Sequence, residues 1–149
     1  MLGVTYFTGD ALGTNTNLGN LIDDTEATNN GQTGAPVGGR WVVVALGRGK
    51  PISIEGLNVS ALLVPGNNRF TALRSFKAYA CTASTKPDNP NPTCDGSIDA
   101  GWNRIVASPA DPFPSVNPRP VTRDMTLRNL KAKGAPPATH VKFVVVANQ

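Results

Sequence analysis

Apolar residues along this chain gather in short runs, and several runs alternate apolar with polar positions. Residues 41–46 are apolar at every position, which is typical of a strand covered on both faces. Residues 76–81 alternate with a period of two, the pattern of a half-buried strand. A change of phase at Gly56 indicates a β-bulge or bend. The whole pattern predicts strands over residues 4–7, 40–46, 52–63, 74–82, 102–107, 125–128 and 139–147.

Turn-forming residues separate these predicted strands. The chain has 15 Gly and 13 Pro, and many of them fall between strands, as at Gly47–Pro51 and Pro65–Asn68. Short strands with turns between them predict an all-β fold, an antiparallel β-sandwich or jelly roll of about eight strands. There is no internal repeat and no linker, so we expect residues 1–149 to form a single domain.

The charges are unevenly distributed along the chain. The net charge is +4, but residues 1–39 hold four acids and no Lys or Arg, whereas the remaining residues hold all 14 basic side chains. A basic surface can attract nucleic acid, anionic glycan or membrane headgroups. The sequence has no dense Lys/Arg cluster, no zinc-finger spacing and no RNP-like aromatic pattern. We therefore expect no nucleic-acid partner.

Two features of the sequence concern membranes and export. No apolar run approaches the ~20 residues that span a bilayer, so we expect no transmembrane segment. Residues 1–5 lack the basic and long apolar regions of a signal peptide. The chain is therefore expected to be either cytosolic or a piece of a larger exported chain.

The two cysteines decide between these locations. Cys81 and Cys94 flank a segment with three prolines and two asparagines, which cannot be a helix or an inner strand. A disulfide that closes such a loop contributes roughly 3 kcal/mol on the chain-entropy model. A metal site is the weaker alternative, because one His and two Cys cannot complete a tetrahedral set. A disulfide predicts an extracellular, secreted protein.

The segment Asn20–Asn29 is rich in acids and hydroxyls and has no basic residue. Hard oxygen ligands of this kind suit Ca²⁺, which takes several carboxylate and carbonyl oxygens. The alternative is a turn in which Asp or Thr side chains cap nearby backbone amides. The spacing excludes an EF-hand.

The order of these segments resembles the discoidin family of β-sandwich domains, also called coagulation-factor type C or galactose-binding-like. The resemblance covers most of residues 18–147. Its matching segments are Leu21–Asp24 with Thr28, Trp41–Gly47, Ile52–Val59, Arg69–Cys81, Gly101-Trp102 and Val141–Phe143.

The chain departs from the pattern of this family at four points. Asn30 stands near a position where the family often has an aromatic residue. Asp24 stands where the early loop of the family has Gly, and Ala45-Leu46-Gly47 lacks the acid of the family's Asp-Leu-Gly. The cysteine pair encloses an internal loop rather than joining the termini.

A narrower resemblance concerns two segments. Residues 69–74 and 108–114 are similar to C-terminal accessory domains of secreted bacterial metallopeptidases of the fungalysin type.

In many discoidin-like domains a structural calcium lies under the early loop and links it to the last strand. By position, the resemblance implies side-chain oxygens from Asp23 and Thr28. It implies carbonyl oxygens from Leu21 and Thr25, and Asn148 or Gln149 would close the site. The usual terminal acid of the family is an amide here, which is expected to weaken calcium binding.

The sequence gives little support for catalysis. The single histidine, His140, lies at the start of the last predicted strand, where a structural role is favoured over a catalytic triad. The carboxylates of Asp23 and Asp24 are adjacent and point apart if the chain is extended, which disfavours glycoside hydrolysis. There is no His-Glu-x-x-His motif, so any peptidase activity belongs to another domain of a parent chain. We expect no enzymatic activity.

Ligand binding by loops at one end of the sandwich is the better hypothesis. Asn68, Arg69 and Arg119 are candidates for polar contact with a glycan or an acidic group, although solvated loop residues have the same composition. Trp102 could stack on a sugar ring, with core packing as the alternative.

Together these features predict a non-catalytic accessory or binding domain of an exported hydrolase, most simply a metallopeptidase. Its partners would be a glycan or another extracellular or matrix surface, together with the catalytic domain of the parent chain. The alternatives are a structural docking domain without a ligand of its own and a stand-alone carbohydrate-binding module.

Overall fold

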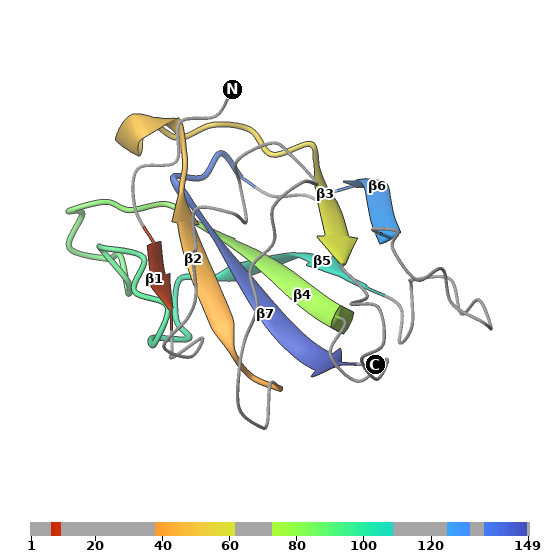
Figure 1. The fold of residues 1–149 in the computed structure, drawn as a ribbon. Helices are drawn as coiled ribbons and strands as arrows, with labels where there is room; N and C mark the ends of the chain where they lie inside the picture. Colours follow the sequence, from red (N-terminus) through yellow and green to blue (C-terminus); the bar gives the residue numbers. More distant parts are fainter. Residues whose placement is uncertain (1–6, 10–37, 62–72, 109–124, 132–135, 149) are drawn as a thin grey trace, which may run out of the picture.

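A computed structural model describes residues 7–9, 38–61, 73–108, 125–131 and 136–148, and the structural statements below concern these residues. They form seven strands and one short 3₁₀ turn, η2 (Gly47–Gly49). The strands are β1 (Phe7–Gly9), β2 (Trp41–Ala45), β3 (Gly56–Ala61), β4 (Leu73–Cys81), β5 (Asn103–Ala107), β6 (Met125–Lys131) and β7 (His140–Asn148) (Figure 1).

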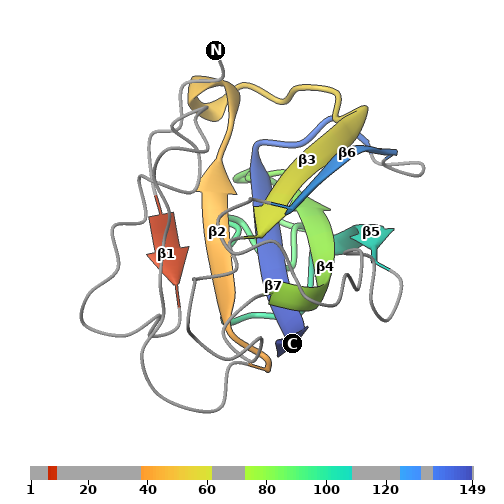
Figure 2. The same cartoon turned by 45° about the vertical axis from the view of Figure 1, so that its right-hand side comes forward.

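All pairings among the described strands are antiparallel. Five strands form one sheet in the order β1-β2-β7-β4-β5, and β3 pairs with β6 in a separate two-stranded sheet (Figure 2). The expected all-β class is therefore confirmed for the described part of the chain. No helix among the described residues is long and apolar enough to cross a membrane.

The predicted strands agree with the observed ones within a few residues, apart from the segment that begins at Ile52. Ile52 forms only an isolated bridge to Ala138, and the continuous strand begins at Gly56. The expected irregularity is present as a register shift between Leu57 and Val59. Of the strand expected over 4–7, only Phe7 lies among the described residues, at the start of β1.

One face of the large sheet carries the main apolar core. Phe76, Ala78 and Ala80 alternate along β4, and each is at most 1% exposed. Phe143 lies opposite Ala78 in β7 and stacks on Phe76, with 4.9 Å between the ring centroids. Further apolar side chains pack against this cluster, namely Ile54, Leu57, Val59 and Leu73. The alternation of residues 76–81 thus places one parity in this core.

Part of the opposite face is covered by the chain between β4 and β5, residues 82–102, which we call the disulfide loop. Cys81 and Cys94 form a disulfide, as the sequence predicts. Within the loop, Gly96 lies against the ring of Trp41 on β2. Val42 and Val43 of β2 are 5% and 1% exposed, so this strand is buried on both faces, as expected from its unbroken apolar run.

Candidate functional site

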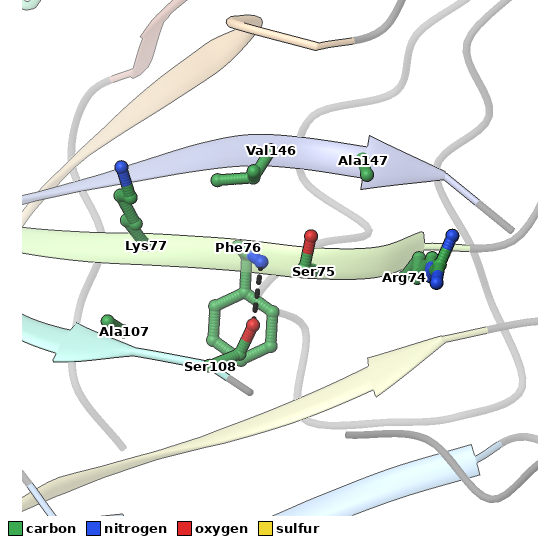
Figure 3. A pocket seen from close by; sticks show the side chains of 8 residues that line it. All are labelled: Arg74, Ser75, Phe76, Lys77, Ala107, Ser108, Val146 and Ala147. Carbon is green, nitrogen blue, oxygen red and sulfur yellow. Dashed lines mark hydrogen bonds between the residues drawn. The ribbon is translucent and has the colours of Figure 1, made fainter. Parts of the chain in front are cut away.

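The large sheet has a hollow of about 320 Å³ at the end where β4 begins and β5 and β7 finish. Its lining is mainly apolar, with two cationic side chains and two hydroxyls. Figure 3 shows the eight lining residues, which are Arg74, Ser75, Phe76, Lys77, Ala107, Ser108, Val146 and Ala147.

The backbone of this end of the sheet is fixed by a reciprocal pair of hydrogen bonds. The Phe76 N–H donates to the Ser108 hydroxyl at 2.9 Å, and the Ser108 N–H donates to the Phe76 carbonyl at 3.0 Å. The side chains of Phe76 and Ser108 point to one side of β4, whereas those of Ser75 and Lys77 point to the other (Figure 3). The hollow is therefore framed by backbone that is already hydrogen-bonded.

The electrostatics of the hollow come from Arg74, which is exposed, and Lys77, which is half-buried. Within the described part of the chain, neither cation has an acidic partner. Val146 is 43% exposed beside them, a high value for a large apolar side chain. The hollow thus has a mainly apolar surface, and two cationic residues contribute to its lining.

Two of the segments predicted to bind a ligand are connected along the chain to the strands that meet at this end of the sheet. Asn68 and Arg69 precede β4, and Arg119 follows β5; all three lie outside the described residues. Because β4 and β5 are antiparallel, the start of one and the finish of the other lie at the same end of the sheet. Arg74 and Lys77 were not among the predicted ligand residues, because cations on an alternating strand have the pattern of an ordinary solvated face.

Trp102 lies at the opposite end of β5, away from the hollow. Its indole N–H donates to the Asp95 carbonyl at 3.0 Å, and the Lys142 ammonium lies 5.2 Å from the ring centroid. Trp102 is half-buried, which fits the packing alternative noted for it. Trp102 is therefore not part of the lining of the hollow.

Lys142 of β7 is the least expected side chain of the fold, because it is 5% exposed. Its ammonium donates to the Gly96 carbonyl at 3.2 Å and lies 3.7 Å from Asp99 Oδ1, whose side chain is fully exposed. The ring centroid of Tyr79 lies 5.6 Å away, so the rings of Tyr79 and Trp102 both contribute cation–π attraction. The ammonium therefore attaches the disulfide loop to the sheet.

The disulfide loop is organised around Asn91, which is completely buried. Its amide donates to the carbonyls of Asp95 and Ala100, and its side-chain oxygen accepts from the Asp95 N–H at 2.8 Å. The Asp95 carboxylate in turn accepts from the hydroxyl and the N–H of Ser97. These bonds, with a smaller effect of nearby Lys142, hold the pKa of Asp95 below its usual range. The disulfide loop therefore has a defined structure that is held by its own side-chain hydrogen bonds.

His140 and Thr139 form the one arrangement in the described residues that could suggest acid–base chemistry. Thr139 Oγ1 lies 2.8 Å from His140 Nδ1, but this hydroxyl also accepts from the Ala83 N–H at 2.8 Å. Thr139 is only 1% exposed. A hydroxyl that is buried and already hydrogen-bonded is not placed to attack a substrate.

Burial lowers the pKa of His140 below its ordinary value of 6.5. The native state therefore binds fewer protons than the unfolded state, and stability is expected to fall as the pH drops below 6.5. Because this is the single histidine in the chain, its imidazole proton resonance is expected to titrate alone, with a midpoint below 6.5. His140→Gln is expected to flatten the dependence of melting temperature on pH between about 7.5 and 5. A midpoint at or above 6.5 would contradict this prediction.

The calcium ligands predicted from the early loop lie almost entirely outside the described residues. This holds for Leu21, Asp23, Thr25, Thr28 and Gln149. Asn148 is described through its backbone, which pairs with Leu73 in β4. Among the described residues there is no cluster of three or more His, Cys, Asp or Glu side chains. The calcium site remains a prediction.

Searches of protein-family models, of curated proteins and of solved structures find no significant match to the chain.

Proposed function

We propose that this chain is a discoidin-like β-sandwich that serves as a non-catalytic binding domain of an exported hydrolase, most simply a metallopeptidase. Three features support the proposal. The described strands are antiparallel, with β3 contributing Leu57 and Val59 to the core of the large sheet. The segments follow the order of the discoidin family. The Cys81–Cys94 disulfide is the kind of cross-link that persists in oxidising, extracellular compartments.

The hollow at the end of the large sheet carries the functional part of the proposal. Its lining is mainly apolar and includes two serines and two cationic residues, and a small number of polar groups in an apolar concavity is typical of ligand sites. Two of the segments expected to bind a ligand connect in sequence to β4 and β5 at this end. We therefore assign this end of the sheet to a glycan or to another ligand displayed on an extracellular surface.

The absence of a catalytic role is part of the proposal and rests on the state of individual groups. The Thr139 hydroxyl is buried and hydrogen-bonded, and the Lys142 ammonium is held by a carbonyl and two aromatic rings. The calcium ion expected beneath the early loop would have a structural role.

A glycan array probed with the whole chain tests this proposal. We expect retention on a subset of extracellular glycans, abolished by heat denaturation of the chain. The alternative, a domain that only docks on its parent, predicts no signal on any glycan. Silence on the array, with the chain shown to be folded by circular dichroism, would therefore favour the docking alternative.

A further inference from the structure

We infer that the Thr139 hydroxyl couples the protonation of His140 to the hydrogen bonds that fasten the disulfide loop to the sheet. Thr139 immediately precedes β7, and His140 is the first residue of that strand. His140 pairs with Cys81, the last residue of β4, and the disulfide loop begins directly after Cys81. The two residues therefore lie at the base of the loop.

Hydrogen bonds between residues 81–83 and 137–139 hold the base of the loop. The Thr139 N–H donates to the Cys81 carbonyl at 3.0 Å, and the Ala83 N–H donates to Thr139 Oγ1 at 2.8 Å. The Thr82 hydroxyl donates to the Pro137 carbonyl at 2.7 Å. The side chain of Thr139 is therefore part of the attachment of the disulfide loop.

The same Thr139 hydroxyl also contacts the imidazole. Thr139 Oγ1 lies 2.8 Å from His140 Nδ1 and 3.4 Å from the Cys81 carbonyl oxygen. A hydroxyl has one proton to donate and can accept two hydrogen bonds. With the neutral imidazole protonated on Nε2, the hydroxyl donates to Nδ1, its nearer acceptor, and accepts from the Ala83 N–H. In this state both hydrogen bonds of the hydroxyl are short.

Protonation of the imidazole reverses one of these hydrogen bonds. Both ring nitrogens of an imidazolium are donors, so Nδ1–H donates to Thr139 Oγ1. The hydroxyl proton then turns to the Cys81 carbonyl oxygen, at 3.4 Å a long distance for an O–H donor. Oγ1 now accepts from a charged donor as well as from the Ala83 N–H, and the charge-assisted hydrogen bond is the stronger one. We therefore expect the hydrogen bond from Ala83 to weaken.

Burial transmits this change to the loop instead of to solvent. His140 is half-buried, so a proton can reach its ring without unfolding of the chain. Thr139 is only 1% exposed, and water therefore does not replace a partner that its hydroxyl loses. The change of donor is compensated within the chain, at Cys81 and Ala83.

The charges around His140 do not account for its protonation. Its partners on the neighbouring strands are Ala45 and Cys81, and neither titrates, because Cys81 is in the disulfide. The charged or titratable residues of the surrounding described elements are Lys142 on β7, Tyr79 on β4, Arg48 and Lys50 at η2, and Lys86, Asp88, Asp95 and Asp99 in the disulfide loop. Burial is the cause that lowers the pKa of His140. Histidine is also the side chain whose ordinary pKa lies between pH 5 and 8.

Proton–nitrogen NMR spectra of the whole chain between about pH 7.5 and 5 test the inference. As the pH falls, we expect the Ala83 amide proton to move upfield, because its hydrogen bond weakens, with the same midpoint as the imidazole of His140. The Gly39 amide donates to the Val145 carbonyl at the other end of β2 and is expected to stay constant. An Ala83 amide that stays constant while the imidazole titrates would overturn the inference, because Nδ1 would then carry a proton throughout.

Four variants locate the coupling in the Thr139 hydroxyl. His140→Gln is expected to make the Ala83 amide independent of pH. Thr139→Val removes the hydroxyl and is expected to abolish the titration of the Ala83 amide, whereas Thr139→Ser is expected to keep it. Thr82→Val is the matched control: it removes the other hydroxyl at the base of the loop, which donates to Pro137, and is expected to leave the titration unchanged.

The other outcomes contradict the inference in distinguishable ways. Titration of the Ala83 amide in His140→Gln would assign the effect to another group. Titration that persists in Thr139→Val would show a through-space effect of the imidazolium charge, without the hydroxyl. Equal loss in Thr82→Val and Thr139→Val would show a general loosening of the loop. If Thr139→Val does not fold, the parent chain, Thr139→Ser and His140→Gln still support or overturn the inference.

Discussion

Replacing both cysteines, as Cys81→Ala with Cys94→Ala, is expected to lower the free energy of unfolding by about 3 kcal/mol. The cross-link closes a short loop in the unfolded chain, and the chain-entropy model assigns it that magnitude. For a chain of this size the loss corresponds to a decrease of roughly 6–12 °C in melting temperature. Alanine is preferred to serine because both positions are only 2% exposed, and a buried hydroxyl would add a cost of its own.

Tryptophan fluorescence makes this prediction specific to the disulfide loop. The chain has two tryptophans, and both contact the loop, Trp41 at Gly96 and Trp102 at Asp95. Reduction of the parent chain is therefore expected to shift the emission to longer wavelength, while the double alanine variant is insensitive to reductant. An unchanged melting temperature in the double variant would contradict the prediction.

Gly96→Ala is expected to destabilise the protein by about 2–3 kcal/mol, the upper part of the range for overpacking. A Cβ atom at this position would overlap the six-membered ring of Trp41, with Cζ3 and Cε3 as its nearest atoms. The ring is rigid and belongs to a strand buried on both faces, so the loop must move away from the sheet. That movement also withdraws the Gly96 carbonyl from the Lys142 ammonium. Urea denaturation of the variant measures the loss.

Two control variants separate the clash from other effects of removing glycine. Gly49 has φ +82° and space for a Cβ atom, with no other atom within 4 Å of where it would lie. Gly49→Ala therefore introduces backbone strain without a clash and is expected to cost about 1 kcal/mol. In a Trp41→Leu background, Gly96→Ala is expected to cost less than in the parent chain, because the opposing ring is gone. Equal costs in the two backgrounds would exclude the clash as the cause.

The strands themselves could be predicted because their patterns are local. The unbroken apolar run of 41–46 and the alternation of 76–81 each report burial directly, and both segments lie in strands of the large sheet. The order of strands could not be predicted in this way. The apolar run of β7 does not indicate that this strand pairs with both β2 and β4. Pairing depends on chain segments that are far apart in sequence.

The burial of individual polar side chains could not be predicted from the sequence, for a physical reason that Lys142 illustrates. Between Val141 and Phe143, a lysine has the pattern of a solvent-facing position, and only the disulfide loop above it makes the position buried. Asn91 is similar, because a Pro/Asn-rich segment predicts a loop but does not show that one amide will hold it together. Burial produced by a distant loop leaves no periodic signal in the strand it covers.

The position of β7 at the centre of the large sheet has a consequence for the kinetics of folding. Its partners β2 and β4 both lie far earlier in the chain, and no pairing of described strands is made across a tight hairpin turn. Loop-closure entropy must therefore be overcome before any of these pairings stabilises the chain. Topologies of this kind fold on timescales of roughly milliseconds to seconds. During synthesis, β2 and β4 must each wait with an unpaired edge until residues 140–148 have been made.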